Sequence, residues 1–245
     1  MSREILKITG EDREHFLQGL VTNDVTRLKD GLVYTAMLTP QGKYIADFFL
    51  VPDGEAILLD VDAALAKSLA QRLGMYKLRS KVAIAPAGLH LHRGLGARPD
   101  GAFDDPRHEG LGWRAYRSEA QDDDTTDWAA LRVALGVPET GAELGPDTFI
   151  LEMGFERLHG VDFKKGCYVG QEVTARMKHK TELRKGLARI TADAPLSAGD
   201  EILADGKPAG TVLSVAGTSA LAYLRFDRAE KGLEAGGQAL GFEKL

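Results

Sequence analysis

Residues 161–180 read VDFKKGCYVGQEVTARMKHK, and they include Cys167, the only cysteine of the chain. Apolar side chains in this stretch recur at every fourth residue: Val169, Val173 and Met177. That spacing predicts a helix over residues 168–177 with one buried face. Cys167 is therefore expected at the N-terminus of a helix. Gly166, just before it, would let the backbone approach a neighbour closely.

A cysteine at such a place has two interpretations. Unpaired N–H groups at a helix N-terminus and the positive charges of Lys164 and Lys165 favour a thiolate, so Cys167 is a candidate reactive thiol. A free cysteine is also a small apolar residue that is often simply buried. On the same helix, Glu172 precedes Arg176 by four residues, a spacing that predicts an ion pair.

The charge around Cys167 differs from that of the whole chain. Residues 164–189 contain eight Lys or Arg and two Asp or Glu, a net charge of +6, whereas the chain carries −5. This basic segment predicts either a solvated surface or a site for an anionic ligand, such as a glutamate tail, or for an acidic partner protein. Because the chain is acidic overall and no cluster of aromatic residues accompanies the segment, we expect no nucleic acid partner.

The composition is that of a globular protein, since 44% of the 245 residues are hydrophobic and 27% are charged. A single cysteine excludes an internal disulfide, a four-cysteine zinc site and a cysteine-ligated iron–sulfur cluster built by one chain alone, and no metal site is predicted. No run of about 18 apolar residues predicts a membrane helix. The first ten residues, MSREILKITG, resemble neither a signal peptide nor a transit peptide. A cytoplasmic protein without a membrane partner is therefore expected.

The chain before this stretch mixes strand and helix patterns. Strands are expected where apolar or alternating runs lie between turn residues: 4–8, 32–38, 44–51, 56–61, 81–85 and 89–92. A helix carrying Phe16 and Leu20 is expected to end near Asn23, and a short helix is expected at residues 128–135. This mixed order favours an α+β fold.

A longer helix is expected between the strands. Its apolar side chains recur every four residues: Val61, Leu65, Leu69 and Leu73. Such a stripe is typical of a helix with one buried face, and Gly74 stands where a helix C-terminus is usually capped.

From Gly186 onward the pattern changes to short strands separated by Gly, Pro, Asp and Ser turns. The expected strands are residues 187–190, 201–203, 210–215 and 220–226. Regular short strands with such turns predict a small barrel or sandwich. A domain boundary is therefore expected at residues 184–186.

The string Lys165-Gly166-Cys167-Tyr168-Val169-Gly170-Gln171-Glu172, followed by Ala175-Arg176, resembles the signature of the YgfZ-like folate-binding proteins. Further segments resemble the same family and cover most of the chain: Gly10-Glu11-Asp12, Phe16-Leu17-Gln18-Gly19, Thr22-Asn23-Asp24, Gln41-Gly42-Lys43, Tyr76-Lys77-Leu78-Arg79, Lys81-Val82 and Gly136-Val137-Pro138. This family belongs to the superfamily of the glycine-cleavage T-protein, a tetrahydrofolate-dependent aminomethyltransferase.

The resemblance implies an α+β fold of the aminomethyltransferase folate-binding type, a three-domain ring with two α+β domains and a C-terminal β-barrel. The α+β region would take residues 1–183, with an inserted subdomain near residues 48–112. The barrel would take residues 184–245, which agrees with the change of pattern at Gly186.

The resemblance also implies a function. It points to a tetrahydrofolate-binding accessory protein that acts in the assembly or repair of iron–sulfur clusters in client enzymes, with the signature cysteine needed for activity. The implied cofactor is tetrahydrofolate or another reduced folate, and the implied partners are iron–sulfur assembly proteins or client iron–sulfur enzymes. The residues assigned to activity are Cys167, Lys165 and Asp47. Those assigned to cofactor binding are Glu152, Tyr168, Gly166, Gly170, Gln171, Glu172 and Arg176.

Glu152 is assigned through a second segment. Leu151-Glu152-Met153-Gly154 with His159-Gly160-Val161-Asp162 resembles the superfamily segment whose glutamate recognises the pterin. A carboxylate can accept two hydrogen bonds from adjacent pterin N–H groups. A glutamate in such a loop is also often only solvated.

Asp47 marks a departure from the transferases. Their loop usually carries two glycines and then a pair of aspartates, whereas residues 42–47 read GKYIAD and keep only one aspartate. The missing carboxylate argues against glycine-cleavage chemistry. Two alternatives stay open: a folate-dependent one-carbon (aminomethyl) transferase or demethylase with an amine substrate facing Asp47, and a folate-binding scaffold whose barrel and basic segment dock a partner.

Overall fold

The computed structural model describes residues 2–122, 124–179, 182–230 and 232–245. The chain forms two compact units, each built from two segments. The first unit comprises residues 1–126 and 158–173, and the second comprises residues 127–157 and 174–245. The domain limits expected from the sequence, 1–183 with an insertion near 48–112 and then 184–245, stay a prediction.

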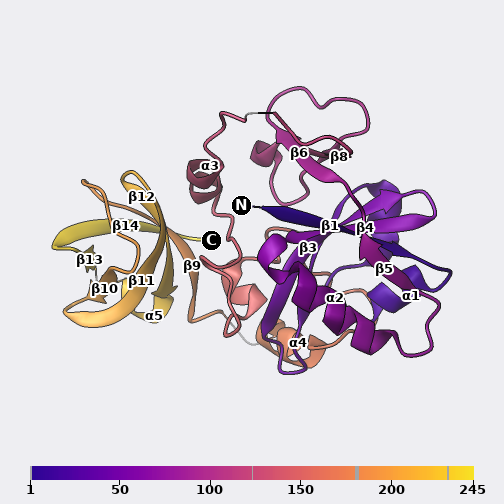
Figure 1. Ribbon diagram of the computed structural model, residues 1–245. Helices are drawn as coiled ribbons and strands as arrows, with labels where there is room; N and C mark the ends of the chain where they lie inside the picture. Colours follow the sequence, from indigo (N-terminus) through magenta and orange to yellow (C-terminus); the bar gives the residue numbers. More distant parts are fainter. Residues whose placement is uncertain (1, 123, 180–181, 231) are drawn as a thin grey trace. The chain divides into compact units, whose positions relative to one another are not determined.

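The first unit is built mainly of strands. Its elements in chain order are β1 (Arg3–Thr9), α1 (Arg13–Gln18), η1 (Val25–Asp30), β2 (Val33–Leu38), β3 (Tyr44–Asp53), β4 (Ala56–Asp62), α2 (Ala63–Lys77), β5 (Ala83–Pro86), β6 (His90–Gly94), β7 (Phe103–Asp104), η2 (Glu109–Leu111) and β8 (Trp113–Arg117). The strands form a five-stranded antiparallel sheet in the order β2-β3-β4-β1-β5 and a three-stranded sheet in the order β6-β8-β7 (Figure 1).

The predicted hairpin between residues 32 and 51 is confirmed. In the register of β2 and β3, Tyr34 lies opposite Phe49 and Ala36 lies opposite Asp47. Gly42 closes the turn at φ +75°, and its N–H donates to the carbonyl of Thr39 at 2.8 Å. A left-handed residue in a turn favours glycine. Because side chains alternate along a strand, Asp47 and Phe49 project from the opposite side of β3 to Phe48.

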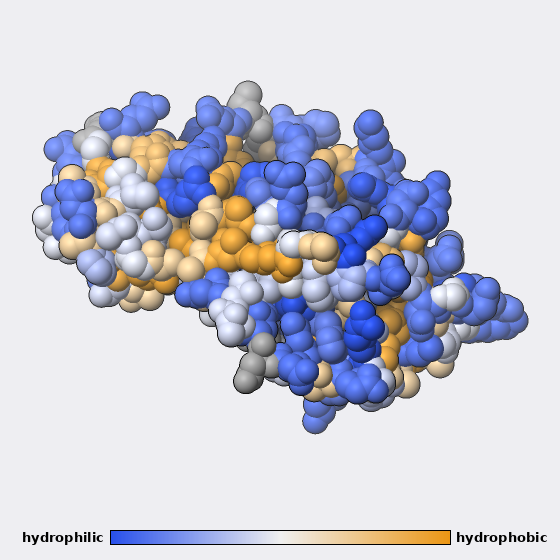
Figure 2. All heavy atoms as spheres, turned by 90° about the horizontal axis from the view of Figure 1, so that it is seen from above, coloured by the Kyte–Doolittle hydropathy of each residue, from blue (hydrophilic) through white to orange (hydrophobic). Residues whose placement is uncertain are grey.

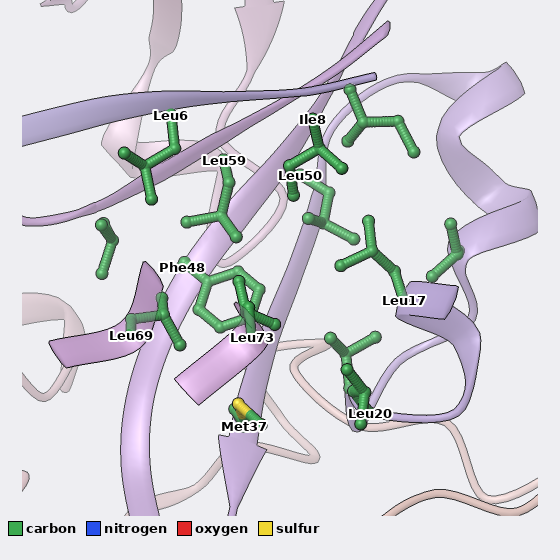
Figure 3. Close-up of a cluster of buried hydrophobic side chains, with 14 of the residues drawn as sticks. Leu6, Ile8, Leu17, Leu20, Met37, Phe48, Leu50, Leu59, Leu69 and Leu73 are labelled. Atoms are coloured by element: carbon green, nitrogen blue, oxygen red, sulfur yellow. The ribbon is translucent and has the colours of Figure 1, made fainter. Parts of the chain in front are cut away.

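One face of the five-stranded sheet carries the main apolar core of the unit. Figure 3 shows Leu69 and Leu73 of α2 pointing at Phe48 of β3 and Leu59 of β4, while Leu17 and Leu20 approach from the α1 segment. Helix α1 ends at Gln18, so the predicted end near Asn23 is wrong and the helix is shorter than the apolar pattern indicates. The apolar side chains of α2 face the core of the unit, as their spacing predicts.

The ends of α2 differ from the prediction. Val61 belongs to β4, and the helix starts after Asp62, whose carboxylate accepts a hydrogen bond from the N–H of Ala64 at 2.8 Å. Gly74 does not cap the helix, which continues to Lys77 and ends at Leu78, a residue at φ +44°. One glycine inside a helix costs only about 1 kcal/mol, and Tyr76 beyond it still packs against the core.

The second unit holds a barrel and the segments around it. Its elements are α3 (Trp128–Leu135), η3 (Ile150–Met153), β9 (Lys185–Thr191), β10 (Glu201–Ala204), β11 (Lys207–Ala216), β12 (Ser219–Arg225), α5 (Phe226–Ala229), β13 (Leu233–Ala235) and β14 (Gln238–Lys244). Helix α4 (Gln171–His179) carries the chain from the first unit into the second.

The six strands β9 to β14 close into a barrel in the order β10-β11-β12-β9-β14-β13. Four of them lie where the sequence pattern places them, so the predicted C-terminal barrel is confirmed. β13 and β14 were not among the expected strands: β13 has only three residues, and a turn at Gly236 and Gly237 joins it to β14. Ile190, Ile202 and Leu224 lie in the interior of the barrel.

Hydrophilic residues predominate on the face of the molecule seen in Figure 2. Among the described residues, the large apolar side chains that are exposed are Met75, Leu78, Leu95 and Phe242. Every helix within the residues that the structure describes is too short or too polar to cross a bilayer.

Candidate functional site

Cys167 is exposed on a loop, with a free thiol. Helix α4 begins at Gln171, so Cys167 lies four residues before the helix and not at its N-terminus as predicted. The buried face of α4 also differs, because Thr174 is the buried residue and Val173 and Met177 are half-buried. The thiol is accessible through its loop, and the helix dipole is too far away to account for its chemistry.

Lys165 holds this loop in place. Its Nζ atom donates hydrogen bonds to three main-chain carbonyls, those of Gln18 at 2.8 Å, Val21 at 2.5 Å and Asn23 at 2.9 Å. An ammonium group has three N–H donors, so all of them are used within the protein. Burial lowers the pKa of Lys165 to about 8, although the carboxylate of Asp24 acts against it. We refer to this arrangement as the lysine clamp.

Tyr168 packs beside the clamp. Its ring is buried, and the Nζ atom of Lys165 lies 5.1 Å from the ring centroid. The N–H of Val169 donates to the carbonyl of Gly19 at 3.3 Å. The loop on both sides of Cys167 is therefore attached to the turn that follows α1, and the thiol projects from a fixed backbone.

The close approach expected at Gly166 occurs instead at Gly170. A Cβ on Gly166 would meet no atom within 4 Å, whereas one on Gly170 would lie 2.6 Å from the carbonyl oxygen of Thr39. A Cβ on Gly42 would likewise lie 2.8 Å from the Cβ of Val173. The β2–β3 turn and the start of α4 thus touch through two glycines, and Gly170 has φ +87°. Nothing in the structure explains a glycine at Gly166.

Asp47 lies on β3 and is 4% exposed. Its Oδ1 atom accepts a hydrogen bond from the hydroxyl of Tyr44 at 2.7 Å, and its Oδ2 atom accepts one from the hydroxyl of Tyr34 at 3.0 Å. Burial and the charge of Asp47 raise the pKa of Tyr34 well above its usual value, so the phenol stays a neutral donor. The sequence analysis did not identify either tyrosine, although a single aspartate in an apolar strand is expected to be buried and therefore to need hydrogen-bond donors.

A network of charges covers the same face of the sheet. Asp60 of β4 pairs with Arg3 at 2.6 Å and with Arg114 of β8 at 2.5 Å. Burial alone would raise the pKa of Asp60, but the charges of Arg3 and Arg114 outweigh it and lower the pKa to about 2. Asp105 joins the network through Arg114 at 3.3 Å and through Arg107 at 2.8 Å. The network fixes β8 to the sheet.

Arg107 links the network to Asp47. Its guanidinium lies 5.4 Å from the ring centroid of Tyr34 and 4.8 Å from that of Phe49. Cations over aromatic rings stabilise the ring position. The carboxylate of Asp47, its tyrosine partners and Arg107 therefore form one connected set on the first unit.

Glu152 belongs to the second unit, on η3, and is buried. Its Oε2 atom accepts a hydrogen bond from the hydroxyl of Tyr223 at 2.6 Å, and its Oε1 atom lies 3.8 Å from the Nζ of Lys185. Burial, with the charge of Glu152, raises the pKa of Tyr223. The carboxylate keeps lone pairs that can accept from further hydrogen-bond donors.

The remaining assigned residues lie on α4. Gln171 is half-buried, whereas Glu172 and Arg176 are exposed. The structure thus brings Lys165, Tyr168 and the Cys167 loop together, holds Asp47 among tyrosines on β2 and β3, and places Glu152 in the other unit. Assignment of these residues to catalysis or cofactor binding stays a prediction.

The fold is that of an aminomethyltransferase. The crystal structure of the glycine cleavage system aminomethyltransferase T from Bartonella henselae matches 99% of this chain and 83% of its own, with a TM-score of 0.80 and 14% sequence identity. This confirms the mixed α and β fold expected from the sequence. Residues 184–244 also match the family model described as the CAF17 C-terminal beta-barrel domain.

In sequence, the chain is similar to proteins named as iron-sulfur cluster assembly factors. The chain is 32% identical over 222 residues to the iron-sulfur cluster assembly factor IBA57 homolog, mitochondrial, of Mycosarcoma maydis, covering 77% of this chain and 55% of that protein. It is 29% identical over 270 residues to the iron-sulfur cluster assembly factor IBA57, mitochondrial, of Mus musculus, covering 91% and 75%. The chain spans about half the length of the first fungal relatives that it matches.

These names correct one expectation. The relatives are named mitochondrial, which contradicts the cytoplasmic location expected from the sequence. That expectation rested on the first ten residues, and residues 3–9 form β1, an internal strand of the five-stranded sheet. The composition of this segment therefore serves the fold and carries no information on location.

Proposed function

We propose that this protein acts in the assembly or repair of iron–sulfur clusters in client proteins and that it belongs among the YgfZ-like folate-binding proteins. The names of its relatives support the iron–sulfur role. The signature around Cys167 supports the narrower assignment. Its partners would be iron–sulfur assembly proteins or client enzymes.

The observation that carries this proposal is the presentation of one thiol. Cys167 is exposed, and the lysine clamp fixes the loop on which it lies. One thiolate cannot hold a cluster, which usually needs four ligands. A single fixed thiol instead suits a protein that shares a cluster, as substrate, with the cysteines of another protein.

The proposed cofactor is tetrahydrofolate or another reduced folate. Glu152 would accept hydrogen bonds from the pterin, with Tyr223 and Lys185 holding the carboxylate in place. A bound reduced folate would supply a carrier for one-carbon units. The resemblance also assigns Gln171, Glu172 and Arg176 to cofactor binding, while Tyr168 and Gly170 act through the shape of the loop.

Two measurements separate the parts of this proposal. Calorimetric titration of tetrahydrofolate into the purified chain tests the cofactor, and we expect Glu152→Gln to weaken binding by at least about tenfold. Complementation of cells that lack the protein, scored by the activity of cluster enzymes, tests the thiol. Cys167→Ala is expected to bind tetrahydrofolate normally and to fail in complementation.

The matched control restores a thiol at another exposed place. Ala97 lies on an exposed loop, so the double variant Cys167→Ala with Ala97→Cys keeps one accessible cysteine. It should fail like the single variant. Full complementation by Cys167→Ala would refute the role of the thiol, and absence of tetrahydrofolate binding would refute the cofactor.

One observation favours a second candidate, a folate-dependent one-carbon transferase or demethylase. Asp47 is buried, with both oxygens accepting hydrogen bonds from phenols. Such a carboxylate could orient an amine substrate. The test is transfer of a one-carbon unit from a methylamine or aminomethyl donor to tetrahydrofolate by this protein alone. Turnover that Asp47→Asn abolishes would establish the transferase, and its absence would leave the assembly role.

A further inference from the structure

Two of the large apolar side chains that are exposed belong to the C-terminal end of α2. Met75 is 68% exposed and Leu78 is 88% exposed. Leu69 and Leu73 of the same helix point into the core, as Figure 3 shows, so the exposed pair is not needed to hold α2 on the sheet.

Leu78 is also in a backbone conformation that disfavours leucine. Its φ is +44° and its ψ is −108°, where a residue with a Cβ is strained by about 1–3 kcal/mol. The conformation is imposed by the chain that follows. The N–H of Ser80 donates to the carbonyl of Lys77 at 2.8 Å, and the N–H of Lys81 donates to the carboxylate of Asp12 at 2.7 Å.

A glycine would therefore suit this position better for folding. Leucine adds backbone strain and leaves almost its whole side chain in water, and it gains no packing in return. A leucine that lowers the stability of the fold and packs against nothing within it suggests a role in binding another molecule.

The charged side chains of residues 63–81 themselves are all positive, although Glu11 pairs with Lys81 and the carboxylate of Asp12 accepts from the N–H of Lys81. Residues 63–81 contain no Asp or Glu, and their charged side chains are Lys67, Arg72, Lys77, Arg79 and Lys81. Lys67, Arg72, Lys77 and Arg79 form no ion pair with any residue that the structure describes. The whole chain carries −5, so this surface is a local reversal of the overall charge. We call it the α2 tip, defined as Arg72, Met75, Lys77, Leu78 and Arg79.

We infer that the α2 tip is a docking surface for an acidic segment of a partner protein, with Leu78 inserted between apolar side chains of that segment. Positive charges would attract the segment and the exposed apolar pair would anchor it. This inference concerns a surface other than the Cys167 loop and does not depend on the proposed function.

Two other classes of partner fit less well. The outer face of α2 carries Lys67, Ser68 and Gln71, so the helix lacks the continuous apolar face with which helices lie on a membrane. A nucleic acid would be attracted by the same positive charges, but none of the five residues of the tip is aromatic, so the tip offers no ring on which bases stack.

The test uses a defined probe, a short fluorescein-labelled peptide of glutamates around a Leu-Phe pair. Fluorescence anisotropy measures its binding to the full chain, and backbone NMR shifts map the site. We expect binding that weakens with salt, with shifts confined to residues 72–81. Leu78→Gly should weaken binding by at least about tenfold. The same variant should unfold at an equal or higher urea concentration than wild type, which excludes misfolding as the cause.

Matched variants distinguish binding at Leu78 from nonspecific binding to any exposed apolar or positively charged side chain. Leu95→Gly removes another exposed leucine, and Lys207→Glu reverses an exposed charge on the barrel. Both should bind the peptide as wild type does, whereas Arg79→Glu should not. Equal binding by Leu78→Gly and wild type, shifts outside the tip, or no binding at millimolar peptide would overturn the inference. So would equal affinity for anionic vesicles or an oligonucleotide, or self-association that Leu78→Gly abolishes.

Discussion

Replacing Lys165 by methionine removes the lysine clamp while keeping an unbranched side chain of similar length. Three main-chain carbonyls, those of Gln18, Val21 and Asn23, then lose the donor they share. A hydrogen bond to a charged group contributes about 1.5–3 kcal/mol, and bonds to one atom are not additive. Since water can reach part of the site, we expect the free energy of unfolding of the first unit to fall by about 2–4 kcal/mol.

The two tryptophans make this measurement specific. Trp113 lies on β8 in the first unit and Trp128 lies on α3 in the second. In a Trp128→Phe background, fluorescence during urea denaturation reports on the first unit alone. With a slope of about 2 kcal/mol/M, the midpoint of Lys165→Met should fall by about 1–2 M. Lys164→Met, which changes an exposed neighbour, should stay within about 0.5 kcal/mol of wild type.

The pH dependence gives an independent check. Burial lowers the pKa of Lys165 to about 8, below the value near 10.4 of an unfolded lysine. Between these pH values the unfolded chain binds the proton more tightly, so stability rises with pH. The stability advantage of wild type over Lys165→Met should therefore grow from pH 8 to pH 10. A Lys165→Met midpoint equal to that of wild type would refute the clamp, and an advantage that shrinks over this range would contradict the lowered pKa of Lys165.

Three further perturbations have effects that the structure specifies. Asp60→Asn leaves two arginines facing an amide and should cost about 3–5 kcal/mol at neutral pH. Because the pKa of Asp60 is lowered to about 2, its stabilising charge should be lost as pH falls from about 4 to 2 in wild type and not in the variant. Gly170→Ala drives a Cβ against the carbonyl of Thr39 and should destabilise by about 2 kcal/mol or more, measured by urea unfolding. Tyr223→Phe removes the donor to Glu152 and should lower stability by about 1–2 kcal/mol in thermal unfolding.

Each of these has its own control. Gly217→Ala places a Cβ in open space at a similar positive φ, so it should cost less than Gly170→Ala, and equal costs would contradict the close approach. For Tyr223, a double-mutant cycle with Glu152→Gln should give a coupling energy of about 1 kcal/mol, and independence of the two effects would contradict the bond. For Asp60, identical acid unfolding of wild type and variant would contradict the depressed pKa.

Much of the fold follows from local patterns. Strands β1 to β4 and the first barrel strands have the apolar runs and turn residues that predict them, and they lie within a few residues of the expected limits. The misses have local causes. The α2 helix passes Gly74 because the packing of Tyr76 outweighs the propensity of one glycine. β13 and β14 form a short antiparallel pair, and the three residues of β13 are too few to show the period of a strand.

The site was less accessible to sequence reasoning. Spacing marked Cys167 and Lys165 but predicted the wrong local geometry, because a helical period says nothing of where the first turn begins. The carbonyl partners of Lys165 are main-chain atoms, which no residue pattern reveals. Tyr34 and Asp60 owe their roles to strand register and to a distant β8, and both depend on tertiary pairing.

The lysine clamp joins parts of the chain that are 142 to 147 residues apart in sequence. During synthesis, the carbonyls after α1 emerge long before Lys165 does, and the contact can form only when most of the first unit is already in place. Closing so long a loop is entropically costly until the intervening sheet has folded. In a chain that is incompletely folded or cleaved by a protease, the segment around Cys167 would therefore not be held by Lys165. In this way, a fixed exposed position of Cys167 depends on completion of the fold of the first unit.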